Sequence, residues 1–506
     1  MRILFYITLF LSLLACDSKE KKEEVTPLLF PDNTQMLFRI NDKDNFLSAI
    51  ANNTFWKTHN PHQLRPHEVK LLNSIPTDDN LWVAFDTEGH FFAITPRISN
   101  DTISFWRNAD TQIQKQAQFG KEWFYTIADN NLVIGDSEAV SAYQQLKQET
   151  KTPRQQSLEQ LQKVGNTECV ATLFFQKDEA NAYFKSFFGT EILQNVKDWV
   201  SLDLFLEENN IRFSGMALIA NANADIMAHT LPYQNNVLNV LPARLRSLIS
   251  YTFDDGDKLA QNDSTATNNP FKTYINGVAF AQTPEGQFAV ASSFDVDETI
   301  KQLPVLSEDF QHNFSMYELN PDIPMDFFTA FVPQFVPKYV GVYEKFLVFT
   351  TTKDLLTSVI NDMQRGNVLS ANKSYDWLEQ NSASNVSVTR LTNLYDNTAF
   401  SSKYPYIAEN YRWAVFQQTP QNDYYVLNFI SQKQTESTLS DEMKERFRLT
   451  LDDQMVIPPT ILLNHRTKQL EIAVQDTNND LYLIGNNGSL LWKKRLDGKI
   501  QSPIYQ

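Results

Sequence analysis

The stretch that indicates the fold most clearly is VAFDTEGHF at residues 83–91, which returns as VAFAQTPEGQF at residues 278–288. In both copies an apolar run leads to Glu-Gly and then to a second apolar run that begins with Phe. Glycine tolerates the positive φ that tight hairpin turns need, so each copy predicts a β-hairpin. The return of one hairpin signal later in the chain suggests an internal duplication.

Four further pairs of segments keep the same order along the chain. They are FPD at 30–32 with LPA at 241–243, Leu37-Phe38 with Leu248-Ile249, NTFWKT at 53–58 with NNPFKT at 268–273, and NLVIGDS at 131–137 with FLVFTTT at 346–352. Identity is low in each pair, but the shared order and near-constant spacing are hard to obtain by chance. We therefore predict two homologous units, residues 27–225 and 238–432. The alternative is two unrelated domains that share turn chemistry.

Each unit is expected to mix strands and helices. In the first unit, an extended run at 36–40 precedes a helix at 44–52, and two strands around 123–134 precede a helix that Ser137 can cap. Strands joined by hairpin turns, with helices between them, are typical of α+β units with mainly antiparallel sheets and packed helices. This α+β class is the predicted fold of both units.

Three motifs carry a resemblance to a known family. They are PDNT at 31–34, NTFWK at 53–57, and the strand-then-helix block at 132–146. As a set they resemble the DUF3352-like family of envelope proteins, over most of residues 27–432. The resemblance implies the fold of the duplicated units. It implies no activity, because the family has none assigned that could be carried over.

The first residues have the pattern of a lipoprotein signal peptide. Arg2 is followed by an apolar run at 3–14, which is too short for a permanent transmembrane helix of about 20 residues. The run ends in LLAC at 13–16, which resembles the bacterial lipobox. We predict a signal peptide at 1–15, cleavage before Cys16, and a diacylglycerol on the Cys16 thiol.

A charged tether follows the predicted lipid attachment site. Residues 17–24 read DSKEKKEE, which is too polar to bury a core, so residues 16–26 are expected to be solvated. Such a stretch resembles the surface-export signals of lipoproteins from the Bacteroidota. We therefore expect lipid anchoring in the outer membrane. Whether the protein faces the periplasm or the cell surface stays open.

Charge and cysteine content exclude some function classes. The net charge is −16 and the pI is about 5.0, which argues against nucleic-acid binding because phosphates need a basic face. The second of two cysteines, Cys169, lies in the apolar run CVATLF at 169–174, so no disulfide framework is expected. A catalytic thiol is the alternative, but a buried structural cysteine is the better interpretation.

The C-terminal segment, residues 456–506, differs in character from the units. Alternating runs at 470–474 and 481–485 are followed by the turn NNG at 486–488 and by LLWKK at 490–494. This pattern resembles one blade of a PQQ-like or WD-type β-propeller, and propellers typically need about four to eight blades. We expect the chain to be a fragment of a longer propeller-containing protein. Docking of these strands on the second unit is the alternative.

The first unit carries an insertion of about 20 residues after Thr58 that has no counterpart in the second unit. Its histidines are a candidate metal site. It holds His59, His62 and His67, which are three of seven histidines, together with Glu68. Three imidazoles and a carboxylate are a conceivable zinc set. However, prolines lie between these histidines, so no single helix face carries all three. We therefore expect a Pro-rich loop with a short helix and no metal.

A second candidate metal site lies in the C-terminal segment. Asp476, Asn478 and Asp480 place oxygens at alternate positions, as the first half of a calcium loop does. The glycine and the bidentate glutamate of such a loop are replaced by Leu481 and Asn487. A turn held by Asx hydrogen bonds explains the same residues, so we expect no calcium.

The sequence therefore leads to a non-catalytic binding or scaffold protein of the cell envelope. We expect no catalytic residues and no cofactor, a membrane contact through the lipid on Cys16, and an envelope protein as the partner. One alternative is a hydrolase of envelope or extracellular polymers, with carboxylates and the insertion histidines in a cleft between the units. Another is a carbohydrate- or lipid-binding module with Trp and Tyr exposed on one face.

Overall fold

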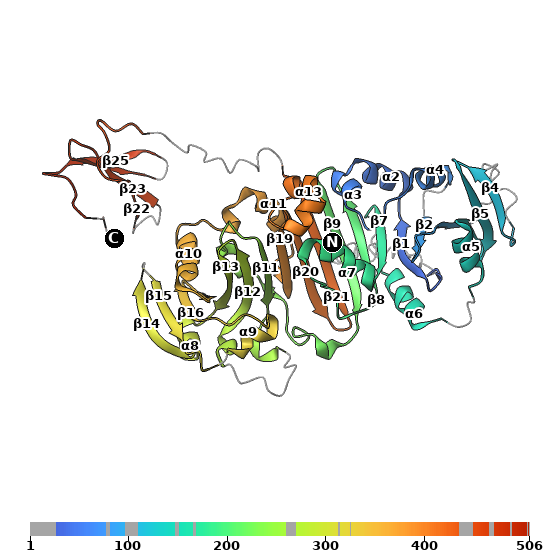
Figure 1. Ribbon diagram of the computed structural model, residues 1–506, viewed down its shortest axis with the longest axis horizontal. Coiled ribbons are helices and arrows are strands. Elements are labelled where there is room, and N and C mark those ends of the chain that lie inside the picture. Colours follow the sequence, from blue (N-terminus) through green and yellow to red (C-terminus); the bar gives the residue numbers. More distant parts are fainter. Residues whose placement is uncertain are drawn as a thin grey trace, which may run out of the picture. The chain divides into compact units, whose positions relative to one another are not determined.

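The computed structural model describes residues 27–76, 81–96, 110–146, 151–164, 168–259, 270–311, 314–323, 325–434, 449–464, 470–485, 488–502 and 504. The predicted signal peptide, Cys16 and the tether lie outside these residues. The chain divides into two compact units, Met1–Gln434 and Thr435–Gln506 (Figure 1). The fold of the chain is mixed α and β, dominated by a large antiparallel sheet.

A sheet of 19 strands forms the frame of the larger unit. Its first half, which we call the first half-sheet, contains the strands that come from residues 34–219. From the outer edge inward the order is β4 (Gln114–Gln118), β5 (Lys121–Ala128), β6 (Asn131–Gly135), β3 (Phe91–Pro96), β2 (Leu81–Asp86), β1 (Thr34–Ile40), β7 (Ala171–Gln176), β8 (Val196–Leu206) and β9 (Asn210–Ile219).

The second half-sheet contains the strands from residues 247–432. From its outer edge inward the order is β14 (Val305–Gln311), β15 (Phe314–Leu319), β16 (Tyr339–Tyr343), β17 (Phe346–Thr350), β13 (Gly286–Ser293), β12 (Ile275–Thr283), β11 (Ser247–Thr252), β19 (Val388–Asn393), β20 (Trp413–Gln421) and β21 (Tyr424–Gln432). Apart from the additional strand β14, the chain order and lateral order match those of the first half-sheet.

The two half-sheets join through their last strands. All nine residues of β21 pair with β9, from Tyr424 opposite Leu218 to Gln432 opposite Asn210. Aromatic rings reinforce this junction: the ring centroids of Phe184 and Phe416 are 5.0 Å apart, and so are those of Phe187 and Phe429. The sheet is therefore continuous across residues that lie about 200 positions apart in sequence, and one hydrophobic core spans the junction.

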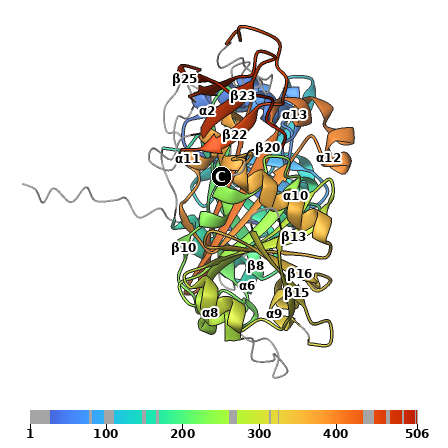
Figure 2. The ribbon, with the colours of Figure 1, turned by 90° about the vertical axis from the view of Figure 1, so that its left-hand side faces the viewer.

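Helices cover both faces of this sheet. The α2 face carries α2 (Lys43–Asn52), α3 (Thr54–Thr58), α4 (Pro66–Ser74), α7 (Lys177–Phe188), α9 (Asp326–Phe331), α12 (Thr398–Lys403) and α13 (Pro405–Asn410). The opposite face carries α5 (Ser137–Gln144), α6 (Pro153–Gln162), α10 (Lys353–Gln364) and α11 (Lys373–Asn381). Figure 2 shows the second half-sheet from its outer edge, where α10 packs on β16 and β17. The remaining short helix of the described residues is α8 (Val296–Lys301).

Local signals account for these elements. Apolar residues alternate between the two faces of β1, so that Phe38 joins the core on the α2 face and Leu37 joins the core on the other. Helix α10 buries Leu355, Leu356 and Val359 on one side, at the spacing of an amphipathic helix. The hairpin between β2 and β3 contains Gly89 with φ +79°, as the Glu-Gly signal predicts.

The smaller unit is a four-stranded antiparallel sheet. Its strands follow chain order: β22 (Thr460–Leu463), β23 (Leu470–Gln475), β24 (Asp480–Ile484) and β25 (Leu490–Arg495). Its core is small, since Val474, Tyr482 and Ile484 are the buried members of its hydrophobic cluster. Beside the main sheet, the two-residue strands β10 (Tyr233–Gln234) and β18 (Asn385–Val386) pair with each other.

Candidate functional site

The insertion after Thr58 forms the helix α4, and the Glu68 carboxylate caps its first turn. Pro66 occupies the first helical position, and Glu68 accepts a hydrogen bond of 2.6 Å from the backbone N–H of Arg65. A carboxylate that closes the cap in this way satisfies a backbone donor that the helix leaves open. The Glu68 side chain is fully buried, which places its charge under α4 and away from solvent.

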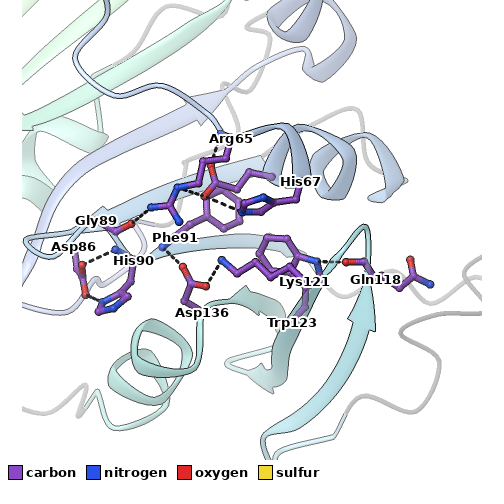
Figure 3. A network of polar contacts seen from close by, with 11 residues as sticks. Arg65, His67, Asp86, Gly89, His90, Phe91, Gln118, Lys121, Trp123 and Asp136 are labelled. Carbon is purple, nitrogen blue, oxygen red and sulfur yellow. Dashed lines mark hydrogen bonds and ion pairs between the residues drawn. The ribbon is translucent and has the colours of Figure 1, made fainter.

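Arg65 ties α4 to the β2–β3 hairpin. Its Nη2 donates to the carbonyl oxygen of Gly89 at 3.1 Å, and its Nε lies 3.6 Å from Oε1 of Glu68 (Figure 3). The guanidinium therefore bridges the insertion and the β2–β3 turn.

Asp86 organises the hairpin turn itself. Its Oδ1 accepts from the backbone N–H groups of Glu88 and His90, at 2.9 and 2.8 Å, and its Oδ2 lies 2.8 Å from Nδ1 of His90. The hydrogen bond to the Asp86 carboxylate raises the pKa of His90. The pair stabilises the turn, since both partners belong to the same hairpin.

Asp136 links the turn to the neighbouring strands. Its Oδ2 accepts from the backbone N–H of Phe91 at 2.9 Å, and its Oδ1 forms an ion pair with Lys121. Lys121 also lies over the ring of Trp123, with Nζ 4.6 Å from the centroid. The expectation that Ser137 caps α5 is wrong: the cap position is Asp136, whose side chain binds β3 instead of its own helix.

His67 and Glu68 bring two unsatisfied atoms together. Nε2 of His67 lies 4.0 Å from Oε1 of Glu68, and both atoms are buried without a hydrogen-bond partner. Burial raises the pKa of Glu68 and lowers the pKa of His67. Because the Glu68 carboxyl has no exposed surface, it cannot reach a polymer chain in solvent. This arrangement serves the packing of α4 better than acid–base catalysis.

The other two histidines of the insertion lie in aromatic surroundings. His59 stacks between Phe187 and Tyr404, with ring centroids 4.7 and 4.4 Å away, and its Nε2 is 2.8 Å from the Ser186 hydroxyl. Burial lowers the pKa of His59 to about 4. His62 packs on Phe85 at 3.7 Å, and burial lowers its pKa to about 4 as well. Within the described ranges, no three histidine, cysteine or acidic side chains converge to hold a metal.

The acidic residues of the C-terminal sheet form a turn. Oδ1 of Asp476 accepts from the backbone N–H groups of Asn478 and Asp480, at 3.0 and 2.9 Å, and its Oδ2 accepts from the Tyr482 hydroxyl at 2.8 Å. Asp480 pairs with Lys493 at 2.9 Å. The Asp476 oxygens are thus engaged by donors from the protein, as expected of an Asx turn.

Cys169 lies in a buried polar network beside β7. Its Sγ accepts from Asn41 Nδ2 at 3.3 Å and lies 3.7 Å from both Thr172 Oγ1 and Asp203 Oδ1. Burial raises the pKa of the thiol to about 11. The thiolate that a nucleophile requires is therefore disfavoured, and Cys169 fits the predicted structural role.

One concave site escaped the sequence analysis. A cavity of about 210 Å³ lies on the α2 face, where the end of α7 meets the second half-sheet. It is lined by Phe188, Thr190, Ser247, Leu248, Ile249, Phe280, Ala281, Gln282, Gln287, Arg390, Leu391 and Thr392. One feature of the sequence could have indicated this site. Arg390 is a charged residue in the strand VTRLTN, at a position where the alternation of apolar and polar residues predicts a side chain that points toward the core.

Comparisons with known proteins add little to this geometry. No protein-family model matches the chain, and no curated protein matches it. A solved structure described as crystal form I of TP0453 is similar at 13% identity, covering 40% of this chain and 81% of that one, with a TM-score of 0.23. Among the described helices, none combines the length and apolarity needed to cross a membrane.

Proposed function

We propose that this protein is a lipid-anchored envelope protein that binds a protein partner without catalysis. The observation that carries the proposal is the apolar surface of the C-terminal sheet. Large apolar side chains there remain exposed: Met455, Ile461, Leu463, Leu470, Leu490, Leu491 and Trp492. Most of these side chains belong to the strands themselves, so the exposed surface is part of an ordered sheet.

The exposed side chains lie on both faces of that sheet. Ile461 pairs laterally with Ile472 on one face, whereas Trp492 pairs with Leu483 on the other. Ile461 is 65% exposed and Trp492 is 45% exposed. An isolated sheet with so little buried core is marginal, and contiguous apolar surface usually marks an interface. We infer that further β-structure from a protein partner covers these faces, in the manner of adjacent propeller blades.

The larger unit supports the duplicated-unit part of the proposal. Corresponding strands of the two half-sheets share one order. Three of the paired sequence blocks include corresponding strands: the Glu-Gly hairpins, Leu37-Phe38 in β1 with Leu248-Ile249 in β11, and residues 131–135 in β6 with 346–350 in β17. We propose that residues 27–225 and 238–432 are homologous units of DUF3352-like type. Their continuous sheet provides an ordered scaffold between the predicted anchor and the C-terminal segment in the chain.

The anchor part of the proposal rests on the N-terminal sequence. Acylation of Cys16 would hold the mature chain at the outer membrane through the charged tether. A Cys16→Ser variant is expected to lose fatty-acid labelling and to leave the membrane fraction. Retention of label in this variant would contradict the anchor.

Site-specific photocrosslinking in cells tests the partner. A photoreactive residue at Trp492 is compared with one at Lys499, which is an exposed loop residue of the same small unit. We expect the Trp492 probe to give a discrete crosslinked protein band that mass spectrometry identifies reproducibly, and the Lys499 probe to give little. Equal, diffuse labelling from both positions, or no adduct from Trp492, would overturn the binding function.

A further inference from the structure

The cavity on the α2 face is a built site, because its walls and floor come from separate parts of the fold. Phe188 and Thr190, at and just after the end of α7, form one side. The strands β11, β12 and β19 form the floor, on which Arg390, Ile249 and Phe280 stand in one lateral row. Neighbours in such a row project from the same face of a sheet, so these three side chains share the cavity.

The described part of the chain places no acidic side chain at ion-pair distance from Arg390. Among the described residues, no carboxylate or carbonyl oxygen lies within hydrogen-bonding or ion-pair distance of its guanidinium, and burial lowers its pKa. Arginine nevertheless stays protonated, so the cavity contains a charged donor group. Arg390 is half-buried. A guanidinium that is partly removed from water and has no acid beside it gains from an anionic partner. The site therefore favours an anion.

The remaining lining combines apolar and polar groups. Phe188, Phe280 and Ile249 offer apolar contacts, whereas Ser247, Thr392 and Gln282 offer hydroxyl and amide groups at the neighbouring row. Small-molecule sites usually combine apolar walls with a few polar groups that orient the ligand. A volume of 210 Å³ corresponds to about seven water molecules at about 30 Å³ each.

We propose that this cavity binds a small carboxylic acid with an apolar body, whose carboxylate pairs with Arg390 and whose hydrocarbon part lies against Phe188 and Phe280. A planar carboxylate matches the fork of the guanidinium, which donates two parallel hydrogen bonds. Hexanoate and benzoate are small acids of a size suited to a cavity of about 210 Å³. This site is independent of the C-terminal sheet and of the partner proposed above.

Calorimetric titration of the full mature chain tests the ligand class. Hexanoate and benzoate are compared with hexanol, which lacks the charge, and with inorganic phosphate, which lacks the apolar body. We expect saturable binding of both carboxylates, and at least tenfold weaker binding of hexanol and phosphate. Phosphate binding as tight as that of hexanoate would overturn the apolar requirement, and equal binding of hexanol would overturn the role of the charge.

Three variants separate the role of Arg390 from general charge loss. Arg390→Met should weaken carboxylate binding at least tenfold, and Arg390→Lys should retain part of it because the charge remains without the planar fork. Arg365→Met removes an exposed arginine after α10 and should leave binding unchanged.

The same variants give a readout without ligand. Arg390→Met replaces a half-buried charge that has no acidic partner among the described residues by an apolar side chain, and should raise the thermal unfolding midpoint of the protein without ligand. A lower midpoint for Arg390→Met than for Arg365→Met would mean that the guanidinium has a partner within the protein. That result, or unchanged carboxylate binding by Arg390→Met, would contradict the site.

Discussion

The two half-sheets share one strand order, yet the α2 face is closed over the first and partly open over the second. In the first half-sheet, Phe46 of α2 and Trp56 of α3 pack on Phe38 of β1, and Leu71 of α4 belongs to the same core. In the second, the described residues between β11 and β12 form the short turns η3 (Gly256–Lys258) and η4 (Pro270–Tyr274). The cavity with Arg390 lies over β11, β12 and β19 of this second half-sheet.

The comparison can be made residue by residue. Phe38 of β1 pairs laterally with Leu173 of β7, and the matching Ile249 of β11 pairs with Arg390 of β19. Phe38 and Leu173 are fully buried, whereas Ile249 is half-buried. A charged side chain takes the place of a leucine on the same strand position. The covering segments, rather than the strand order, therefore decide whether this position belongs to a packed core or to a binding cavity.

The largest expected effect comes from truncating Phe38, which lies where helices cover the α2 face of the sheet. Phe38→Ala should destabilise the protein by about 3–5 kcal/mol, because Phe38 packs against Phe46, Trp56 and Phe85 and a large cavity would remain. Ile249→Ala should cost only about 1–2 kcal/mol, since its site already borders an open cavity. Chemical denaturation of both variants measures the difference, and equal losses would break the comparison.

Two arginines, the buried Arg39 and the half-buried Arg390, give the second-largest effect. Arg39 of β1 donates from Nη1 to the Gln162 carbonyl and from Nη2 to Thr172 Oγ1, both at 3.2 Å. Arg39→Met should cost about 2–4 kcal/mol, because it leaves buried acceptors and the nearby Asp203 without their donor. The sign is opposite to that expected for Arg390→Met. Urea unfolding of the two variants under the same conditions checks this, and a matching sign would contradict the contrast.

The smallest expected effect is a pH-dependent contribution to folding stability that the β2–β3 hairpin has and the β12–β13 hairpin lacks. His90 corresponds to Gln287 in the second copy, and the Asp86 carboxylate raises the pKa of His90. The stabilisation is therefore fully present below the unfolded pKa of about 6.5 and is lost as pH rises through the higher folded pKa. His90→Gln should remove up to about 1 kcal/mol at low pH and nothing at high pH, since the side chain is partly exposed.

The free energies of unfolding of wild type and His90→Gln, measured from about pH 5.5 to about pH 9, test this expectation. This range extends to both sides of the ordinary histidine pKa of about 6.5. A difference between wild type and His90→Gln that is constant across the range would show that the Asp86 contact contributes no proton-linked stability. A difference that grows with pH would contradict the assigned sign.

Much of the local structure follows from local patterns. The Glu-Gly hairpins, the strand at 36–40, the helix after it, and the antiparallel strands of the C-terminal segment were all expected from periodicity and turn chemistry. The surroundings of the candidate site residues could not be predicted in this way, because they depend on the tertiary structure. His59 meets Phe187 and Tyr404, and Glu68 lies under its own helix, which spacing alone does not show.

The α+β class and the antiparallel hairpins could be predicted from the sequence, because alternation and turn residues act over a few positions. The tertiary structure decided that β9 pairs with β21, that α2–α4 close one half-sheet, and that Arg390 has no partner among the described residues. The physical reason is that alternation specifies which face of a strand is apolar. It does not specify which strand will satisfy the hydrogen bonds along its edge, or which segment will cover its face.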